Sequence, residues 1–569
     1  MSPKLFDHRF GRPTWARLVA CCALSCTTWA AVGCGRTVSK DDQGVAGSGP
    51  LDPIPPDNFE DCPVPSLGPT PLRRLSHFEL NHSLQDLFAG VPAMSELPQL
   101  PQGPYYDDPL QEITSATTEH HHALAHEIAL KVSQDAASLQ ALTGCDPATA
   151  GEMACLSQFL GDFLPRAYRR PVNSEELAAV TEVFGDGVRV GGDHASGVRA
   201  VLEVVLQSPD FLYLVEEGEQ VRGTPSGLVA LKSRETASRL SYFLAGSAPD
   251  AELMQAADQD TLREVSQIEA HARRLLAAPR AREVVRHFYT RLLKLDHVTL
   301  SVVPDQPTFT EEVAQLTLQE THHFIDDVTF DGAGSFRALL TEPSTWVNGP
   351  LASFYGLPGV TGQAFQKVGL EPSRRAGLLT QASFLRVTSP GRDTRPVLRG
   401  HAVLKNLLCV DLPLPPPDVV VLPPADSASP NATTRQRLEA VTSSAACADC
   451  HRDLDPVGFA FEHYDSMGLW RDTENDSPID SSGELLKTDA RGKFDSAIDL
   501  IERMAGSEDA QSCYIRHWMK FAYGRDEAPE DACTRSALQA AFRASDGNVL
   551  ELLVAVAKTD HFRYRLESL

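Results

Sequence analysis

The sequence predicts a mostly α-helical, multi-domain protein. Apolar residues recur with a period of 3.6 over long stretches, and helix-capping residues stand before several of them. Segments rich in Pro and Gly separate these stretches. A chain of 569 residues is too long for one hydrophobic core, so we expect several helical domains in series.

The first 34 residues have the pattern of an export signal. Four basic residues precede an apolar run over 18–33, which is shorter than a transmembrane helix needs to be. The run ends in Ala31-Val32-Gly33-Cys34, which resembles a bacterial lipobox in which Cys34 is lipidated. Plain signal cleavage and a signal anchor are the alternatives. We expect an exported cell-envelope lipoprotein, on the periplasmic face or the cell surface, that meets the membrane only through this anchor.

The charge of the chain excludes one class of partner. The formal net charge is −25, and removing the signal takes away four basic residues and Asp7, which leaves a charge of about −28. Such a charge repels nucleic acid and anionic membrane surfaces and attracts basic partners in a salt-dependent way. Nucleic-acid binding is therefore not expected.

A flexible tether precedes the first helical module. Residues 35–71 are rich in Gly, Pro, Ser and Asp, a composition typical of linkers. Ser76-x-x-Glu79 is a capping box that precedes apolar residues on one helix face. It begins a module expected over 72–144.

Two further helical modules follow. The module at 145–222 contains an amphipathic helix that ends at Tyr168 and a second helix capped at Asn173. The Arg169-Arg170 pair between them can bind a propionate or phosphate, but local pairing with carboxylates is the preferred interpretation. Long helical periodicity continues through a module at 223–358.

Two groups of helical side chains have metal-ligating types. His122 and His126 are four residues apart on one helix, and His323 can join Glu320 and Asp327. Solvated or partly exposed helix faces explain both groups more simply.

The last two modules are expected at 359–480 and 481–569. The first contains a Pro-rich strap, in which residues 413–417 are expected to form extended polyproline II, and then the sequence Cys447-Ala448-Asp449-Cys450-His451. The strap is expected to span a surface and position the module that follows it.

The C-x-x-C-H spacing predicts one covalently bound haem c. Two thiols three residues apart on a helical turn can each add to a haem vinyl group, and the adjacent histidine can bind the iron. Cys447 and Cys450 are thus the expected attachment sites and His451 the axial ligand. Met467 and Met519 are the preferred sixth ligands.

Other residues near this motif have weaker assignments. Asp455, Glu462 and Asp465 can form a calcium site or accept a hydrogen bond from the axial histidine, and loop capping explains them equally well. His463 and His517 are bis-histidine alternatives for the sixth ligand.

Six other cysteines remain after Cys34, and an oxidising compartment favours three disulfides. Sequence proximity predicts the pairs Cys145–Cys155 and Cys513–Cys533, which leaves Cys62–Cys409.

Two competing interpretations of the C-x-x-C pair remain open. A zinc site would join Cys447, Cys450, Cys513 and Cys533, although the spacing of the second pair does not favour it. A thiol redox switch lacks the preceding strand-then-helix context of thioredoxin-like proteins.

Several further motifs resemble one family. They are Leu72-Arg73-Arg74-Leu75-Ser76, Arg166-Ala167-Tyr168-Arg169-Arg170-Pro171, Ala237-Ser238-Arg239-Leu240-Ser241-Tyr242-Phe243-Leu244, Arg375-Ala376-Gly377-Leu378-Leu379-Thr380-Gln381, Phe461-Glu462-His463-Tyr464-Asp465 and Phe521-Ala522-Tyr523-Gly524-Arg525. Their order is similar to that of exported multi-domain proteins of planctomycetes and myxobacteria, built from domains of unknown function 1587, 1595, 1592, 1588 and 1585. The resemblance implies a C-terminal cytochrome-c-like helical module and names no reaction or substrate.

These observations lead to one functional hypothesis. We expect a haem-containing protein that transfers electrons to or from a redox partner outside the cytoplasm. A haem-dependent oxidoreductase acting on an unidentified substrate is one alternative, and a cell-surface binding or scaffold protein with a structural C-x-x-C-H module is the other.

Overall fold

The chain is mostly α-helical, as predicted, with short strands between the helices. The computed structural model describes residues 67–96, 114–302, 306–412, 431–443 and 445–567. The export signal, Cys34, most of the tether, Cys62 and the segment at 413–417 lie outside these ranges. None of the helices in the described ranges combines the length and apolarity needed to cross a bilayer.

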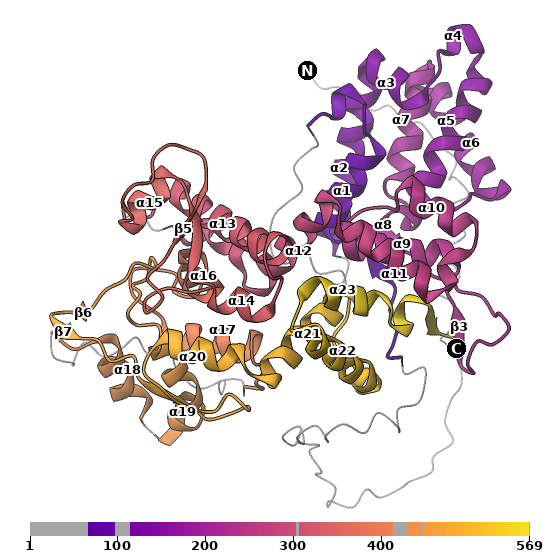
Figure 1. The fold of residues 1–569 in the computed structure, drawn as a ribbon. Helices are drawn as coiled ribbons and strands as arrows, with labels where there is room; N and C mark the ends of the chain where they lie inside the picture. Colours follow the sequence, from indigo (N-terminus) through magenta and orange to yellow (C-terminus); the bar gives the residue numbers. More distant parts are fainter. Residues whose placement is uncertain (1–66, 97–113, 303–305, 413–430, 444, 568–569) are drawn as a thin grey trace, which may run out of the picture. The chain divides into compact units, whose positions relative to one another are not determined.

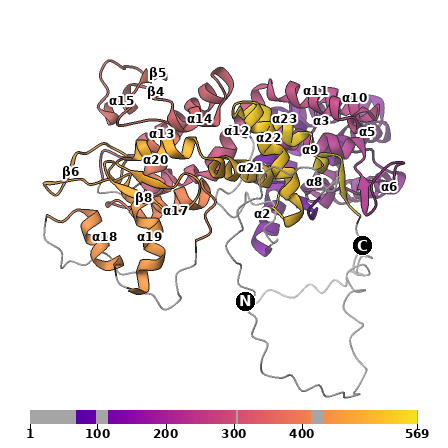
Figure 2. The ribbon, with the colours of Figure 1, turned by 60° about the horizontal axis from the view of Figure 1, so that its bottom comes forward.

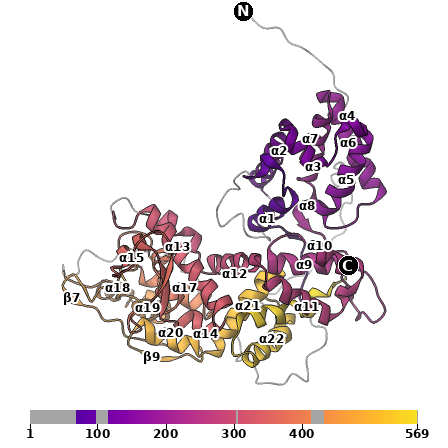
Figure 3. The same ribbon diagram turned by 45° about the horizontal axis from the view of Figure 1, so that its top comes forward.

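The N-terminal helices share one apolar core (Figure 3). These helices are α1 (His77–Leu87), α2 (Ser115–Gln134), α3 (Ala136–Thr143), α5 (Glu152–Tyr168), α6 (Ser174–Gly191), α7 (His194–Val205) and α8 (Pro209–Leu212). The short helix α4 (Pro147–Ala150) has no buried side chain and lies outside this core. Leu80, Ile128, Phe159 and Val201 are among its buried side chains. The modules expected at 72–144 and 145–222 therefore bury their apolar faces together.

Most of the remaining helices contribute to a second, larger core (Figure 1). They are α9 (Ser233–Ala245), α10 (Ala251–Asp258), α11 (Val265–Leu276), α12 (Pro279–Leu292), α13 (Glu311–Asp326), α14 (Phe336–Thr341), α16 (Ala382–Val387), α17 (Pro396–Asn406), α19 (Ala445–Phe459), α20 (Ala497–Ala505), α21 (Glu508–Tyr523), α22 (Ala532–Ala544) and α23 (Val549–Ala557). Helix α15 (Gly349–Tyr355) packs in a separate small cluster, and the side chains of α18 (Thr434–Thr442) lie outside the larger core. Leu240, Phe461 and Trp518 lie in this core and come from three different expected modules. Those modules are therefore not separate packing units.

The strands form five two-stranded antiparallel sheets within the described residues. The pairs are β1 (Arg73–Arg74) with β2 (Tyr213–Leu214), β3 (Leu228–Ala230) with β10 (Tyr564–Leu566), β4 (Ser344–Val347) with β5 (Gln366–Gly369), β6 (Thr473–Glu474) with β7 (Ser477–Pro478), and β8 (Gly483–Leu485) with β9 (Gly492–Phe494). In the second pair Tyr564 lies opposite Ala230, so the C-terminal end of the chain is tied to the start of the third expected module.

Capping boxes begin helix α1, where one was predicted, and helix α6, where a cap at Asn173 was predicted. The Ser76 hydroxyl accepts a hydrogen bond from the backbone N–H of Glu79, and Glu79 Oε2 accepts one from the Ser76 N–H at 2.9 Å. Asn173 and Glu176 make the same reciprocal pair at α6. Each box satisfies backbone N–H groups that have no partner inside the helix, which is why these helix starts could be predicted from local sequence.

One predicted disulfide is confirmed, and the other two pairings are wrong. Cys145 bonds to Cys155, as sequence proximity indicated. Cys409 instead bonds to Cys513, 104 residues away, so neither Cys513–Cys533 nor Cys62–Cys409 forms. Cys533 is disulfide-bonded as well. The error arose because proximity along the chain ignores packing, which brings the end of α17 against α21.

Helices α17 and α19 cross with their backbones in close contact (Figure 2). A Cβ atom at Gly400 would lie 2.2 Å from the carbonyl oxygen of Leu454, and one at Gly458 would lie 2.0 Å from that of Pro396. Both distances are far shorter than van der Waals contact. Only glycine therefore fits at these two positions of the crossing.

The crossing predicts a large cost for a single methyl group. Gly400→Ala and Gly458→Ala should each destabilise the protein by about 2–3 kcal/mol, because the helices must move apart. Urea unfolding measures the shift in midpoint. Gly185→Ala in α6 is the matched control, because a Cβ atom there meets nothing within 4 Å. This substitution should stabilise the protein by roughly 0.5–1 kcal/mol, because alanine has the higher helix propensity. Wild-type stability in Gly400→Ala would contradict this packing.

Candidate functional site

The C-x-x-C-H sequence lies on helix α19, as predicted. Cys447 and Cys450 are three residues apart and therefore lie on neighbouring positions of one helix face. Both thiols are free and half-buried. Cys450 also packs against the larger core, so one side of the pair is fixed by the protein interior.

A hydrogen-bonded chain orients His451. Its Nδ1 lies 2.8 Å from Oδ1 of Asp455, one helical turn further along α19. Asp455 Oδ2 accepts a hydrogen bond of 2.9 Å from the hydroxyl of Thr442 at the end of α18. With Nδ1 as the donor to this carboxylate, Nε2 is the ring nitrogen available to a metal.

Asp455 is held in a nearly dry environment. It is 5% exposed, and burial raises the pKa of its carboxyl, while the hydrogen bond to His451 lowers it. Of the three acidic residues considered for calcium, Asp455 is the one that hydrogen-bonds His451. Across the described residues, the side chains grouped closely enough to hold a metal ion do not include these acids.

Two fully buried arginines hold the loop that follows α19. Arg399 on α17 donates to the carbonyl oxygens of Phe461, Tyr464 and Asp465 at 2.8–3.0 Å. Burial lowers the pKa of Arg399 to about 10, although the nearby Glu462 carboxylate opposes that effect. This guanidinium fixes the loop to α17.

The second arginine, on α16, joins Ser466 of the same loop to two other segments. Arg386 donates to the carbonyl oxygens of Ser301, Gly391 and Ser466 at 3.0, 2.7 and 3.2 Å. Carbonyl groups in a buried loop need such donors, because water cannot reach them. The two arginines therefore position the segment between α19 and β6 and, with it, the end of the C-x-x-C-H helix.

Trp470 and Arg471 have structural contacts in this loop. The Trp470 ring stacks on His463 with a centroid distance of 4.7 Å, and Arg471 Nη2 lies 3.1 Å from Glu462. Asp465 Oδ1 accepts hydrogen bonds from the backbone N–H groups of residues 467 and 469. These two hydrogen bonds cap the loop, which is one of the two interpretations given for Asp465.

The two preferred sixth ligands lie in packed apolar surroundings. Met519 on α21 is 1% exposed and belongs to the larger core. Met467 packs against a small cluster that contains Phe309, and the Thr308 hydroxyl lies 3.3 Å from its sulfur. The choice between these methionines stays a prediction.

The residues of α19 fit a covalently bound haem. The two motif thiols are free, whereas the other cysteines of the described ranges are in disulfides. The histidine beside them has one ring nitrogen fixed by a buried carboxylate, which is the usual arrangement of a metal-binding imidazole. Free thiols and an oriented imidazole are the donor set that haem c requires.

Four family models match the chain. Three of them describe proteins of unknown function: DUF1595 matches residues 155–216, DUF1592 matches 231–357 and DUF1585 matches 491–562. The fourth, named PSCyt3, is DUF1588 at 375–474 and contains the C-x-x-C-H helix. Together the matches cover more than half of the chain.

The chain belongs to the multi-domain proteins of the PSD and PSCyt families. Each match lies inside the module of the same kind expected from the sequence, and the 1587-like module at 72–144 stays a prediction. No curated protein and no solved structure is significantly similar to the chain.

The arginine pair Arg169-Arg170 of this PSD/PSCyt protein has a local role. Arg169 donates to backbone carbonyl oxygens, including that of Tyr213 at 2.8 Å. Arg170 forms ion pairs with Glu176 at 2.7 Å and Asp210 at 2.6 Å. Local pairing with carboxylates is therefore confirmed for Arg170, whereas Arg169 bonds backbone carbonyl oxygens instead.

Among the residues that the structure describes, the two histidine groups considered for metal binding do not assemble into metal sites. On α2, His122 lies 3.2 Å from a side-chain oxygen of Gln207, and His126 lies 2.9 Å from one of Glu203. On α13, His323 stacks on Trp346 with a centroid distance of 5.6 Å.

Glu320 and Asp327, the two carboxylates considered as metal ligands together with His323, also have separate partners. Asp327 pairs with Lys367 at 2.7 Å. Glu320 is buried and accepts hydrogen bonds of 2.6 Å from the hydroxyls of Thr345 and Tyr355. The carboxylates and His323 therefore do not converge on one ligand.

Sequence analysis missed one group of potential ligands. Cys409, Cys513 and His517 offer ligand atoms that all lie within 4.8 Å of one another. The spacing of Cys513 and His517, four residues apart in a helical pattern, was a usable signal. Cys409 joins them only through tertiary packing, which no local pattern reveals.

Burial of Glu320 predicts a pH dependence of stability. Desolvation raises its pKa from 4.5 to about 7, so the folded state binds more protons than the unfolded state between these values. Stability contributed by this group is full below pH 4.5 and is lost as pH rises through 7, on the order of 3 kcal/mol.

Replacing this carboxyl tests the assignment. Glu320→Gln should flatten the decline in melting temperature between pH 5 and pH 7.5 relative to wild type, because the glutamine does not ionise. Exposed Glu371→Gln is the control and should keep the wild-type slope. Parallel curves for wild type and Glu320→Gln would show that Glu320 does not titrate in this range.

Proposed function

We propose that this protein is an exported, c-type-haem protein that transfers electrons outside the cytoplasm. The observation that carries the proposal is the free thiol pair Cys447 and Cys450 beside an imidazole fixed by Asp455. The name of the matching DUF1588 family, PSCyt3, agrees with a cytochrome-like module. When bound, the haem would supply a one-electron couple.

The two cysteines would hold the cofactor by thioether bonds. They lie on one turn of α19 and keep their thiols free, in a chain whose other described cysteines are oxidised. Thioether attachment requires free thiols, which this pair offers. Helix α19 is held by the Gly400 crossing, so both thiols would be presented from a fixed backbone.

His451 would bind the iron through Nε2. The carboxylate of Asp455 accepts the Nδ1 proton, which fixes the ring orientation and makes the imidazole a stronger donor. Thr442 in turn holds Asp455. These two contacts would hold the imidazole ring in one orientation, as an axial haem ligand requires.

The exposure of His451 and the export signal bear on the redox partner and on the location of the protein. The side chain of His451 is 26% exposed, so the site lies close enough to the surface for a redox partner to approach. The acidic chain favours a basic partner at low ionic strength. We place the protein at the cell envelope, anchored through lipidated Cys34, because of the signal pattern described above.

Substitution of the thiols tests covalent attachment. Protein exported with cytochrome c maturation machinery should give a c-type reduced pyridine haemochrome and a haem-stained band after denaturing electrophoresis. Cys447→Ala/Cys450→Ala should lose the stained band, because neither thioether can form. Cys145→Ala/Cys155→Ala is the control and should keep it. Well-folded wild-type protein without haem after maturation would overturn the proposal.

Carbon monoxide distinguishes electron transfer from chemistry at the iron. A reduced protein whose sixth position is filled by a side chain should not change its spectrum on addition of carbon monoxide. A rapid spectral change would replace electron transfer with the haem-dependent oxidoreductase hypothesis. The covalent attachment would be unaffected by that result.

The contact between His451 and Asp455 predicts a shift in reduction potential. Asp455→Asn should keep the covalent haem but raise the potential, because a neutral amide no longer stabilises the more positive ferric state through the imidazole. Spectroelectrochemical titration measures the change. Asp453→Asn on the same helix, which removes a pairing with Lys487, should shift it less. Equal potentials in wild type and Asp455→Asn would contradict this role.

A further inference from the structure

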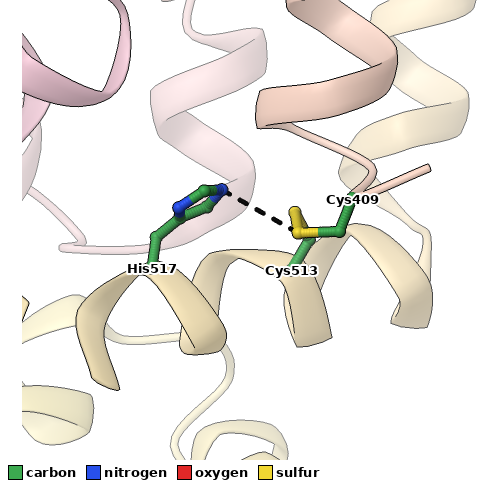
Figure 4. Close-up of side chains that lie close together, drawn as sticks. All are labelled: Cys409, Cys513 and His517. Carbon is green, nitrogen blue, oxygen red and sulfur yellow. Dashed lines mark hydrogen bonds between the residues drawn. A yellow bond between two sulfur atoms is a disulfide. The ribbon is translucent and has the colours of Figure 1, made fainter. Parts of the chain in front are cut away.

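A second group of ligand atoms lies away from the C-x-x-C-H helix. The disulfide between Cys409 and Cys513 joins the segment after α17 to α21, and the ring of His517 points at it (Figure 4). Nε2 of His517 lies 3.9 Å from the sulfur of Cys409. Within the described residues this is the group close enough to bind a metal ion.

Two of the three side chains are placed by one helix. Cys513 and His517 are four residues apart on α21 and share a face. Cys409 reaches them because its backbone adopts φ 48°, in the left-handed region that residues other than glycine rarely occupy. That conformation turns the chain after α17 toward α21.

The end of α17 lies beside the same group. The sulfur of Cys513 lies 3.7 Å from the backbone carbonyl oxygen of Asn406, the last residue of α17. A hydrogen bond from the His517 ring to this backbone partly opposes the lowering of the histidine pKa by burial. The end of α17 therefore contacts both α21 side chains of the group.

We propose that Cys409, Cys513 and His517 form a redox-gated zinc site. The site is closed while the disulfide is intact and binds one Zn²⁺ once the disulfide has been reduced. It is separate from the haem site and does not depend on the proposed electron transfer. Two thiolates and one imidazole are ligands that zinc prefers, and a water molecule would supply the fourth position.

A dithiol can reduce the disulfide between Cys409 and Cys513 and so open the site. A thiolate of the dithiol attacks the sulfur of Cys409, which is partly exposed, whereas Cys513 is buried. Cys513 leaves as a thiolate, and the second thiol of the reductant then releases Cys409 as its own disulfide forms. The protein gains two electrons and two protons. Binding of Zn²⁺ displaces both thiol protons to solvent.

The geometry requires little movement. Tetrahedral zinc with bonds of about 2.3 Å to sulfur and 2.0 Å to nitrogen places sulfur and nitrogen about 3.5 Å apart and the two sulfurs about 3.8 Å apart. The present nitrogen-to-sulfur distance of 3.9 Å is already close. Side-chain rotation alone can separate the sulfurs, because the two Cα atoms are 5.4 Å apart.

Metal titration of the full holoprotein tests the site. Protein reduced with a phosphine and then desalted without oxygen should bind one equivalent of Zn²⁺ more than unreduced protein. Co²⁺ in place of Zn²⁺ should give a thiolate-to-cobalt charge-transfer band only after reduction. His517→Gln leaves the disulfide possible and should weaken Zn²⁺ binding at least about tenfold.

Cysteine variants separate this site from the other thiols. Cys409→Ser/Cys513→Ser should lose the additional equivalent, whereas Cys145→Ser/Cys155→Ser should keep it. The cobalt spectrum of reduced wild-type protein decides the question even if a variant does not fold. Absence of the charge-transfer band in reduced wild type would overturn the proposal, as would equal Zn²⁺ affinity in His517→Gln. The haem stain is independent of every outcome.

Discussion

The backbone contact between α17 and α19 is the constraint on which both candidate sites depend. Gly400 and Gly458 allow the helices to approach until a methyl group would overlap a carbonyl oxygen. Helix α19 carries the C-x-x-C-H motif. The end of α17 leads into Cys409, whose disulfide reaches α21. A change in this crossing would therefore move the thiols of one site and a ligand of the other.

Buried charge fixes the loop beside the crossing. Arg399 is fully buried and satisfies three loop carbonyl groups, while Glu462 lies 3.7 Å away and also contacts Arg471. Taking such charges out of water is costly, and removing one partner leaves the other unpaired. This arrangement stabilises the native loop geometry only as a complete set. The rigid loop in turn limits how the end of α19 can move.

Features set by neighbouring residues were predictable, and features set by packing were not. The Ser76 cap and the Cys145–Cys155 disulfide depend on residues close in sequence, and both are confirmed. The C-x-x-C-H motif could be recognised because its defining residues lie within five consecutive positions of the sequence. The Cys409–Cys513 disulfide joins residues 104 positions apart, so it requires knowledge of how α17 meets α21. The buried partners of the loop likewise come from distant helices.

The most direct test of the central claim is the intact mass of the exported, matured protein, with its tryptic map. We predict a polypeptide heavier than the processed chain by the mass of one haem, with the added mass on the peptide that contains Cys447 and Cys450. That result would establish the thioether bonds on α19. A fully folded, processed chain without the added mass, and with both thiols free to alkylation, would contradict the account.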